Sequence, residues 1–180
     1  MKKIYIAIII ILAVGAAFYV YRNKNVAPVS MDSVKVFNGK NSSFVINNET
    51  VQLTNGSHEV EAAPGSASKI ETKYFGNEGK GDLNGDGKED ISFLVYQRTG
   101  GSGVFYYAVV ALKTDDGYKT TNAFFIGDRI APQTTEIRSG ELHVNYAERA
   151  SGEPMTTQPS VGAVTLLKVT PGGVLEGLMK

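Results

Sequence analysis

Short β-prone runs separated by turn residues fill the chain from Ser42 onward, and this pattern restricts its fold more than any other feature. No segment after residue 25 shows the 3.6-residue periodicity of an amphipathic helix. Without alternating strands and helices, the pattern favours an all-β fold, either an antiparallel sandwich or a small barrel. Val104 to Leu112 is the most apolar and β-branched run, so we expect it to form a central strand.

Several turns carry residues that suit the tight connections of β-hairpins. The candidates are Asn47-Asn48, Asp116-Gly117 and Ser139-Gly140. The second should lead into one strand from Tyr118 to Ile126. The third would place Arg138 opposite Glu141 and Ile137 opposite Leu142, which gives one charged and one apolar cross-strand pair.

The N-terminal residues 4–21 contain no charged side chain, and basic residues flank them on both sides. As a helix they would span about 27 Å, close to the roughly 30 Å of a membrane hydrocarbon core. We therefore expect residues 1–24 to form one transmembrane helix that anchors the chain. The alternative is a secretory signal peptide cleaved after small residues, for which Ala13-Val14-Gly15 is a suitable site.

The rest of the chain divides into three parts by composition. Residues 25–41 are polar and should form a tether, residues 42–170 the β domain, and residues 171–180 a flexible tail that begins at Pro171-Gly172-Gly173. Four of the 18 basic residues and none of the 18 acidic ones lie in the first 25 positions, which leaves a net charge of about −4 beyond them. Nucleic-acid binding needs positive charge to release counterions, so we expect no such partner.

The chain has no cysteine. This excludes disulfides, a thiol nucleophile and a cysteine-based zinc site. An exported domain of this composition must be held together by packing, hydrogen bonds or a bound ion.

An acidic loop from Asp82 to Asp90 has the strongest chemical signal in the sequence. Its side-chain oxygens stand at relative positions 1, 3, 5 and 9, and the backbone carbonyl of position 7 adds another ligand. Calcium prefers six to eight such oxygens, and glycine allows the sharp turn around the ion. The expected calcium ligands are Asp82, Asn84, Asp86, Lys88 (through its carbonyl) and Asp90. The simpler alternative is a polar turn without an ion, since Asn, Asp and Gly favour turns in any case.

The same stretch resembles the calcium loops of FG-GAP/VCBS-type repeats and the first nine positions of dockerin and EF-hand loops. This resemblance implies the same ligand set. It departs from the EF-hand at Phe93, where a bidentate glutamate would stand, and a strand-like run follows the loop in place of a helix. Those repeats occur in arrays, and this chain has one copy, so the resemblance covers the ion site alone. More loosely, Ser42 to Val169 resembles uncharacterised bacterial exported proteins, which implies an envelope location.

Other polar residues have weaker signals. Asp128, Arg129, Glu148, Arg149 and Glu153 flank two loops that contain Gly and Pro. They could form ion pairs, a binding surface, or the paired carboxylates of a glycan or peptide hydrolase. His58, His143 and Ser102 lie in no catalytic or metal-spacing motif, and we expect ordinary structural roles for them.

Together these patterns predict a membrane-anchored, calcium-stabilised β domain with a binding or envelope-structural role and no enzymatic activity. Residues 4–21 would hold it in the cytoplasmic membrane as a single-pass protein with its C-terminal domain outside; with cleavage it would be secreted. The ion argument supports the outside location, because weak calcium sites fill in the extracellular calcium range. The alternative function is an envelope hydrolase acting through Asp128, Glu148 and Glu153. The sequence does not identify a protein or glycan partner.

Overall fold

The computed structural model describes residues 36–178, which form an all-β fold with one short 3-10 turn. The predicted anchor, residues 1–24, and the tether before residue 36 lie outside this range. Within residues 36–178, no helix has the length and apolar character needed to cross a membrane.

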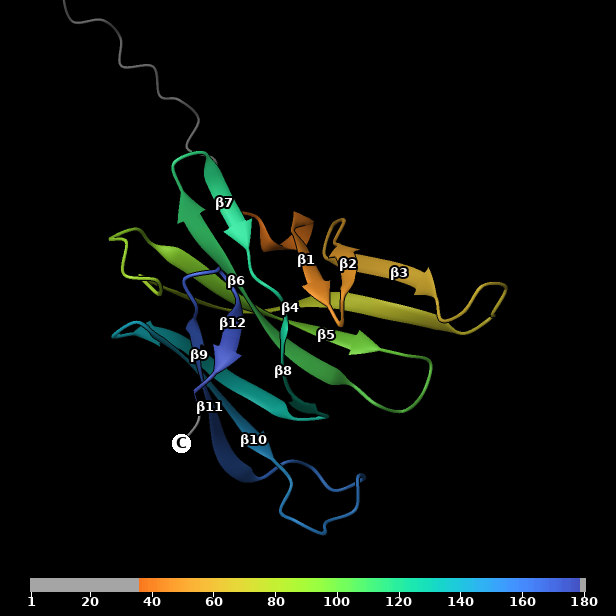
Figure 1. The fold of residues 1–180 in the computed structure, drawn as a ribbon. Helices are drawn as coiled ribbons and strands as arrows, with labels where there is room; N and C mark the ends of the chain where they lie inside the picture. Colours follow the sequence, from red (N-terminus) through yellow and green to blue (C-terminus); the bar gives the residue numbers. More distant parts are fainter. Residues whose placement is uncertain (1–35, 179–180) are drawn as a thin grey trace, which may run out of the picture. The chain divides into compact units, whose positions relative to one another are not determined.

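Twelve strands and the 3-10 turn follow one another along the described chain (Figure 1). They are η1 (Gly39–Asn41), β1 (Ser43–Ile46), β2 (Glu49–Gln52), β3 (Ser57–Glu61), β4 (Lys69–Gly81), β5 (Asp90–Arg98), β6 (Phe105–Thr114), β7 (Gly117–Thr120), β8 (Phe124–Asp128), β9 (Ala131–Arg138), β10 (Glu141–Glu148), β11 (Val161–Val169) and β12 (Leu175–Gly177).

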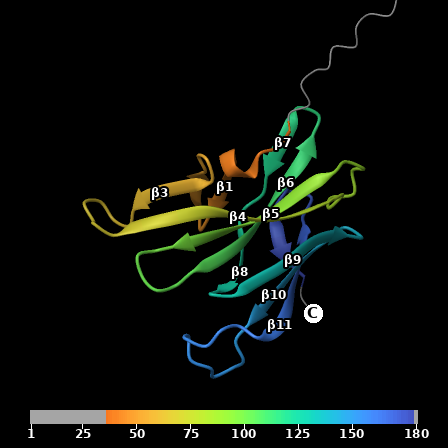
Figure 2. The same cartoon turned by 180° about the vertical axis from the view of Figure 1, so that it is seen from behind.

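Three sheets arise from these strands, and every ladder between named strands is antiparallel. The central sheet has the order β3-β4-β5-β6-β7, with β8 also paired to β6; the outer sheet has the order β12-β11-β10-β9; β1 and β2 form a separate hairpin. Figures 1 and 2 show the outer sheet on one side of the central sheet and the β1–β2 hairpin on the other. The predicted antiparallel all-β class is confirmed, in three layers.

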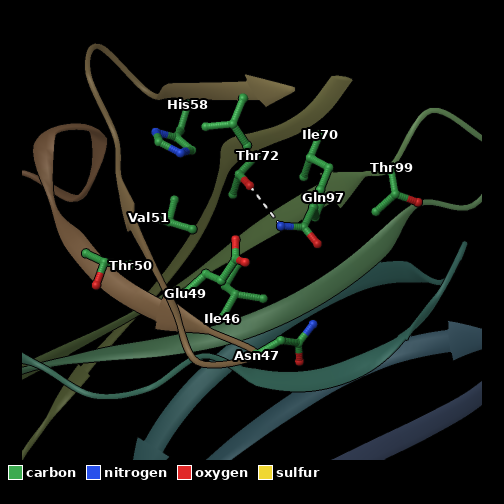
Figure 3. Close-up of a pocket in the computed structure, with 11 residues that line it drawn as sticks. Ile46, Asn47, Glu49, Thr50, Val51, His58, Ile70, Thr72, Gln97 and Thr99 are labelled. Atoms are coloured by element: carbon green, nitrogen blue, oxygen red, sulfur yellow. Dashed lines mark hydrogen bonds between the residues drawn. The ribbon is translucent and has the colours of Figure 1, made fainter. Parts of the chain in front are cut away.

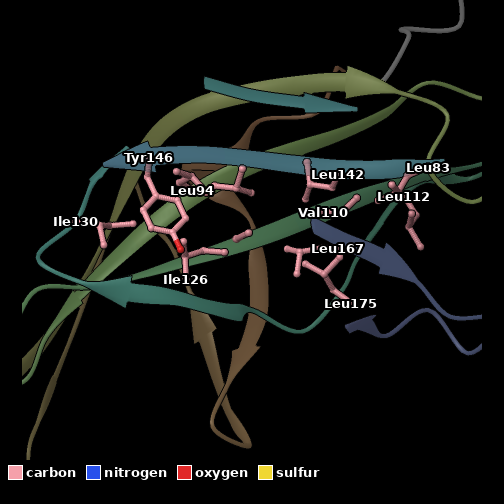
Figure 4. Close-up of a cluster of buried hydrophobic side chains, with 12 residues drawn as sticks. Leu83, Leu94, Val110, Leu112, Ile126, Ile130, Leu142, Tyr146, Leu167 and Leu175 are labelled. Atoms are coloured by element: carbon pink, nitrogen blue, oxygen red, sulfur yellow. The ribbon is translucent and has the colours of Figure 1, made fainter. Parts of the chain in front are cut away.

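The two middle strands of the central sheet, β5 and β6, are buried on both faces over most of their length. One apolar cluster joins it to the outer sheet (Figure 4) and includes Leu94, Val110, Leu142, Tyr146 and Leu167. A second cluster joins it to the hairpin and includes Phe44, Leu53, Phe93, Val95 and Val109. Because successive residues of a strand point to opposite faces, the central positions of β5 and β6 supply apolar side chains to both clusters. This explains the continuous apolar run of β6, which pairs with β5, β7 and β8 and is central as predicted.

The predicted hairpin turns are confirmed where their backbone requires unusual φ angles. Asn47 and Asn48 have φ of 50° and 70°, and Ser139 has φ of 55°. The β9–β10 register pairs Arg138 with Glu141 and Ile137 with Leu142, as expected from the turn. The ion pair of Arg138, however, is with Glu136 on its own strand, at 3.1 Å.

The expected strand from Tyr118 to Ile126 is interrupted, and β7 and β8 are separate strands on the same neighbour, β6. Asn122 lies at the break. Its side-chain amide donates to the Leu175 carbonyl at 3.1 Å and accepts from the Leu175 amide at 2.8 Å. Its backbone forms a bridge with Val45 of β1. The interruption therefore lets one residue join the central sheet to the hairpin and to the last strand.

The folded unit extends beyond the expected β domain, residues 42–170, at both ends. The flexible tail expected at residues 171–180 contains β12, which pairs with β11 and places Leu175 in the core at 1% exposure. At the other end, Phe37 belongs to the folded unit although residues 25–41 were expected to form a tether. Its ring centroid lies 5.6 Å from that of Phe93 and 5.2 Å from that of Tyr118.

Two glycines near the end of β4 let the outer sheet approach closely. A Cβ at Gly79 would lie 2.7 Å from the Thr135 carbonyl oxygen, and one at Gly81 would lie 2.9 Å from the Ile137 side chain. Any larger residue would push β9 away from β4. The close approach fixes the position of the segment that follows Gly81, which is the acidic loop.

We predict that Leu175→Ala lowers the free energy of unfolding by about 2–5 kcal/mol, because it leaves a cavity in the core between the central and outer sheets. Val174→Ala is the matched control, since Val174 is 49% exposed and should change stability by less than about 0.5 kcal/mol. Urea unfolding of both variants measures the difference. Equal stability of the two variants would contradict the placement of β12.

Candidate metal site

The acidic loop connects β4 to β5, which are antiparallel neighbours joined by the pair Gly81 and Asp90 at the base of the loop. Gly85 and Gly87 both have φ of 79°, a conformation that favours glycine. The chain therefore makes two sharp local turns within a few residues, as expected for a loop that closes on itself.

Asp82 organises the loop by accepting hydrogen bonds from its backbone. Its Oδ1 accepts from the amides of Gly85 at 2.7 Å and Asp86 at 3.2 Å, and its Oδ2 accepts from the amide of Gly87 at 2.8 Å. Three backbone dipoles thus converge on one carboxylate. These hydrogen bonds hold the loop closed.

Asn84 and Asp86 lie beside this carboxylate. The Asp86 amide donates to Asn84 Oδ1 at 3.0 Å, and Asn84 Nδ2 donates to Asp86 Oδ2 at 3.3 Å. Asp86 Oδ1 accepts from the Lys88 amide at 2.9 Å. The loop therefore brings Asp82, Asn84 and Asp86 together, with the side chains of the last two exposed to solvent.

The side chain of Lys88 has a partner outside the loop. Its ammonium pairs with Asp115, in the β6–β7 turn, at 2.7 Å. This contact lowers the pKa of the Asp115 carboxyl and raises the pKa of Lys88, chiefly through the hydrogen bond between them. Only the backbone carbonyl of Lys88 was a candidate ligand, and the ion pair leaves that group unaffected.

Asp90 has a different environment from the rest of the predicted ligands. It is fully buried, and its two oxygens accept from the backbone amides of Leu83 at 3.0 Å and Lys113 at 2.8 Å. Burial raises the pKa of this carboxyl, and the nearby charges of Asp86 and Asp82 raise it further, against the opposing effect of the two hydrogen bonds. Asp90 thus ties the loop to β6 from inside the protein.

The donor set differs from a purely acidic metal centre. Among the residues described, no three His, Cys, Asp or Glu side chains are arranged to hold a metal ion. Apart from buried Asp90, the candidate donors of the loop are the carboxylates of Asp82 and Asp86, the amide oxygen of Asn84 and backbone carbonyls. Oxygen donors of this kind suit calcium, which accepts carbonyl, amide and water ligands beside carboxylates.

The second set of charged residues makes contacts within and between its own loops. The carboxylate of Asp128 pairs with Arg129 at 2.6 Å and accepts from the Val104 amide at 2.9 Å. Arg149 donates to the Arg129 carbonyl at 2.9 Å, and Glu153 accepts from the Ala150 amide at 2.9 Å.

These contacts lower the pKa of Asp128, mainly through the hydrogen bond from Arg129. A general acid needs a raised pKa, so Asp128 is poorly suited to that role. Glu148, the remaining carboxylate of the set, is exposed at the end of β10.

Two of the residues expected to be structural have definite partners. His143 Nε2 lies 3.3 Å from Glu141 Oε2 on the same strand, and His58 Nδ1 lies 3.1 Å from the Gln52 carbonyl oxygen. His58 also lines a cavity with Glu49, Thr72 and Gln97 (Figure 3), which the sequence analysis did not identify. The sequence held one sign of this cavity. Thr72 and Gln97 are polar residues at strand positions that face the β1–β2 hairpin, where the neighbouring positions are apolar.

We predict that Asp90→Asn destabilises the protein by about 1–3 kcal/mol, because an amide can accept only one of the two buried backbone hydrogen bonds. The loss should be the same with calcium and with a chelator. Glu89→Gln, at the exposed neighbouring position, should leave the stability unchanged. Denaturant unfolding in both conditions measures this, and a wild-type stability for Asp90→Asn would contradict the role of this carboxylate.

Comparisons with known proteins identify no relative of this chain. The chain matches no family model, no curated protein and no solved structure. The resemblance of Asp82 to Asp90 to repeat-type calcium loops therefore stands on those residues. Any function must be argued from the contacts described above.

Proposed function

We propose that this protein is a membrane-anchored extracytoplasmic β domain, stabilised by calcium bound in the loop from Asp82 to Asp90, with a binding or envelope-structural role. The observation that carries the proposal is the arrangement of Asp82, Asn84 and Asp86 around one closed loop. Three backbone amides position the Asp82 carboxylate, and the other two side chains lie beside it.

Electrostatic repulsion gives this loop a reason to bind a cation. Asp82, Asp86 and Asp90 lie close enough that the first two carboxylates raise the pKa of the third. A divalent ion would offset this repulsion. Asp90 is the least accessible of the predicted ligands because it is buried and already accepts two hydrogen bonds. We therefore propose Asp82, Asn84, Asp86 and the Lys88 carbonyl as the main ligands, with Asp90 holding the loop in place.

The location proposed for the domain follows from the ion and from residues 4–21. Calcium sites of extracellular modules have dissociation constants of about 10⁻⁴–10⁻³ M. A site of that affinity fills outside the cell and stays mostly empty in the cytosol. An uncleaved apolar segment of 18 residues would hold the domain at the outer side of the cytoplasmic membrane.

We infer a non-enzymatic role from the contacts of the candidate catalytic residues. Asp128 has a lowered pKa and is paired with Arg129, and Glu153 accepts a hydrogen bond within its own loop. These carboxylates have structural partners, which supports binding or organisation of the envelope over hydrolysis.

We predict that 10 mM calcium stabilises the full-length chain in detergent by about 1.4–2.7 kcal/mol, the value expected for dissociation constants of about 10⁻³ to 10⁻⁴ M. The melting temperature should rise by several degrees. Asp86→Ala should abolish the rise. Glu89→Ala, an acidic position of the same loop that is not a proposed ligand, should retain it. A wild-type protein whose melting temperature ignores calcium would end the ion proposal.

We predict that the C-terminal domain is accessible from outside the cytoplasmic membrane. Ser102, in the exposed β5–β6 loop, is a suitable labelling site because the chain has no cysteine. A Ser102→Cys variant should react with a membrane-impermeant maleimide in intact protoplasts, whereas Lys3→Cys should react only after lysis. Labelling of Ser102→Cys only after lysis would refute the location, and the mass of the labelled chain distinguishes an anchor from a cleaved signal.

A further inference from the structure

A cavity of about 380 Å³ lies between the β1–β2 hairpin and the end of the central sheet that the hairpin leaves uncovered (Figure 3). We call it the hairpin trough. One wall is formed by the hairpin residues Ile46, Asn47, Glu49, Thr50 and Val51. The rest is formed by residues of β3, β4 and β5 and by Thr99, just beyond β5. Its volume is in the range of sites that bind small molecules or short segments of chain.

The strand register divides the sheet side of the trough into two rows. His58, Thr72 and Gln97 are direct cross-strand neighbours on β3, β4 and β5. Gln97 Nε2 donates to Thr72 Oγ1 at 3.2 Å, and Thr72 is fully buried. Val60 and Ile70 form the next row. The trough therefore has a polar row that can hydrogen-bond beside a row of branched aliphatic side chains.

Glu49 is the acidic side chain of the trough, and it lies on the inner face of the hairpin. Strand alternation puts it on the same side as buried Val51. Figure 3 shows its carboxylate directed over Thr72 and Gln97. No lysine or arginine lines the trough, and Glu49 has no ion-pair partner among residues 36–178. The trough is therefore complementary to a positively charged group.

The hairpin also offers backbone groups along the trough. Asn47 and Asn48 form a two-residue turn, so Ile46 and Glu49 are a hydrogen-bonded pair and the next pair, Val45 and Thr50, is not. The Val45 carbonyl accordingly accepts from Ala123 on the far side of the hairpin, at 2.8 Å. The amide and carbonyl of Thr50 point the opposite way, toward the open edge of β2. An extended segment could pair with this edge.

We propose that the hairpin trough binds an extended peptide segment that has a basic side chain close to a branched aliphatic one. The peptide would pair with the open edge at Thr50, its basic group would meet Glu49, and its aliphatic side chain would pack on Val60 and Ile70. A sugar ring would be expected to stack on Phe, Tyr or Trp side chains. None of these lines the trough, where Val60 and Ile70 instead form an aliphatic floor. This inference names a partner for the binding role proposed above and does not depend on the ion, since the acidic loop precedes β5 and the trough lies at its other end.

The test compares two blocked synthetic pentapeptides, serine–valine–lysine–valine–serine and the same sequence with glutamate in place of lysine. Titration into the ¹⁵N-labelled full-length chain in detergent should shift the amide signals of Thr50, Thr72 and Gln97 with the lysine peptide. The glutamate peptide should bind at least about tenfold more weakly, as expected for the loss of a charge-assisted contact. Equal binding of the two peptides would overturn the proposal.

Variants then locate the contact. Glu49→Gln should weaken the lysine peptide about tenfold without changing the melting temperature. Glu59→Gln, on the opposite face of β3 and ion-paired with Lys69, should bind it like the wild type. Val60→Lys places a positive charge in the trough that repels the lysine of the peptide, and it should abolish binding. Wild-type affinity in Glu49→Gln or Val60→Lys would overturn the proposal.

Two further measurements separate this proposal from its alternatives. If chitotriose shifts the same amide signals and the lysine peptide does not, the peptide proposal is overturned in favour of a glycan ligand. The calcium melting shift, measured on the same samples, reports on the ion site alone. Peptide binding without a calcium response would retain the trough and end the ion proposal, and the reverse result would end the trough proposal.

Discussion

Burial of β5 and β6 on both faces is the constraint on which the rest of the structure depends. Phe93 and Val109 are fully buried toward the hairpin, and Leu94 and Val110 toward the outer sheet. Each such side chain gains about 1.5–3 kcal/mol from burial. Because the two sets alternate along the same strands, removal of either the hairpin or the outer sheet would expose about half of these apolar side chains. The small hairpin is therefore as necessary as the larger sheet, although it contributes only two short strands.

Features set by local backbone chemistry could be predicted from the sequence. Ser139-Gly140 adopts positive φ angles that few other pairs tolerate, and the turn then fixes the register of Arg138 with Glu141. Features that depend on distant partners could not. Leu175 follows Pro171-Gly172-Gly173, which suggests a tail. The segment is a strand because it pairs with β11, because Asn122 bonds to Leu175 and because the Leu175 side chain enters the core.

The candidate sites divide in the same way. The spacing of Asp82, Asn84 and Asp86 is a local property, and the closed loop with these three side chains together follows from it. The burial of Asp90 depends on the neighbouring β6, which supplies the Lys113 amide. The hairpin trough depends on how far β1 and β2 extend over the central sheet, and nothing in the local sequence sets that distance.

The side chain of Asn122 also determines when the fold can be completed. Its partner, Leu175, lies 53 residues later in the chain. A chain that emerges N-terminus first exposes Asn122 long before the residue that satisfies it. Until then the amide must bond to water, and the core between the central and outer sheets lacks one of its walls. The last strand, β12, can therefore join β11 and Asn122 only after nearly the whole chain has emerged. Stalled or truncated chains stay open at this point, and proteases can recognise them as incomplete.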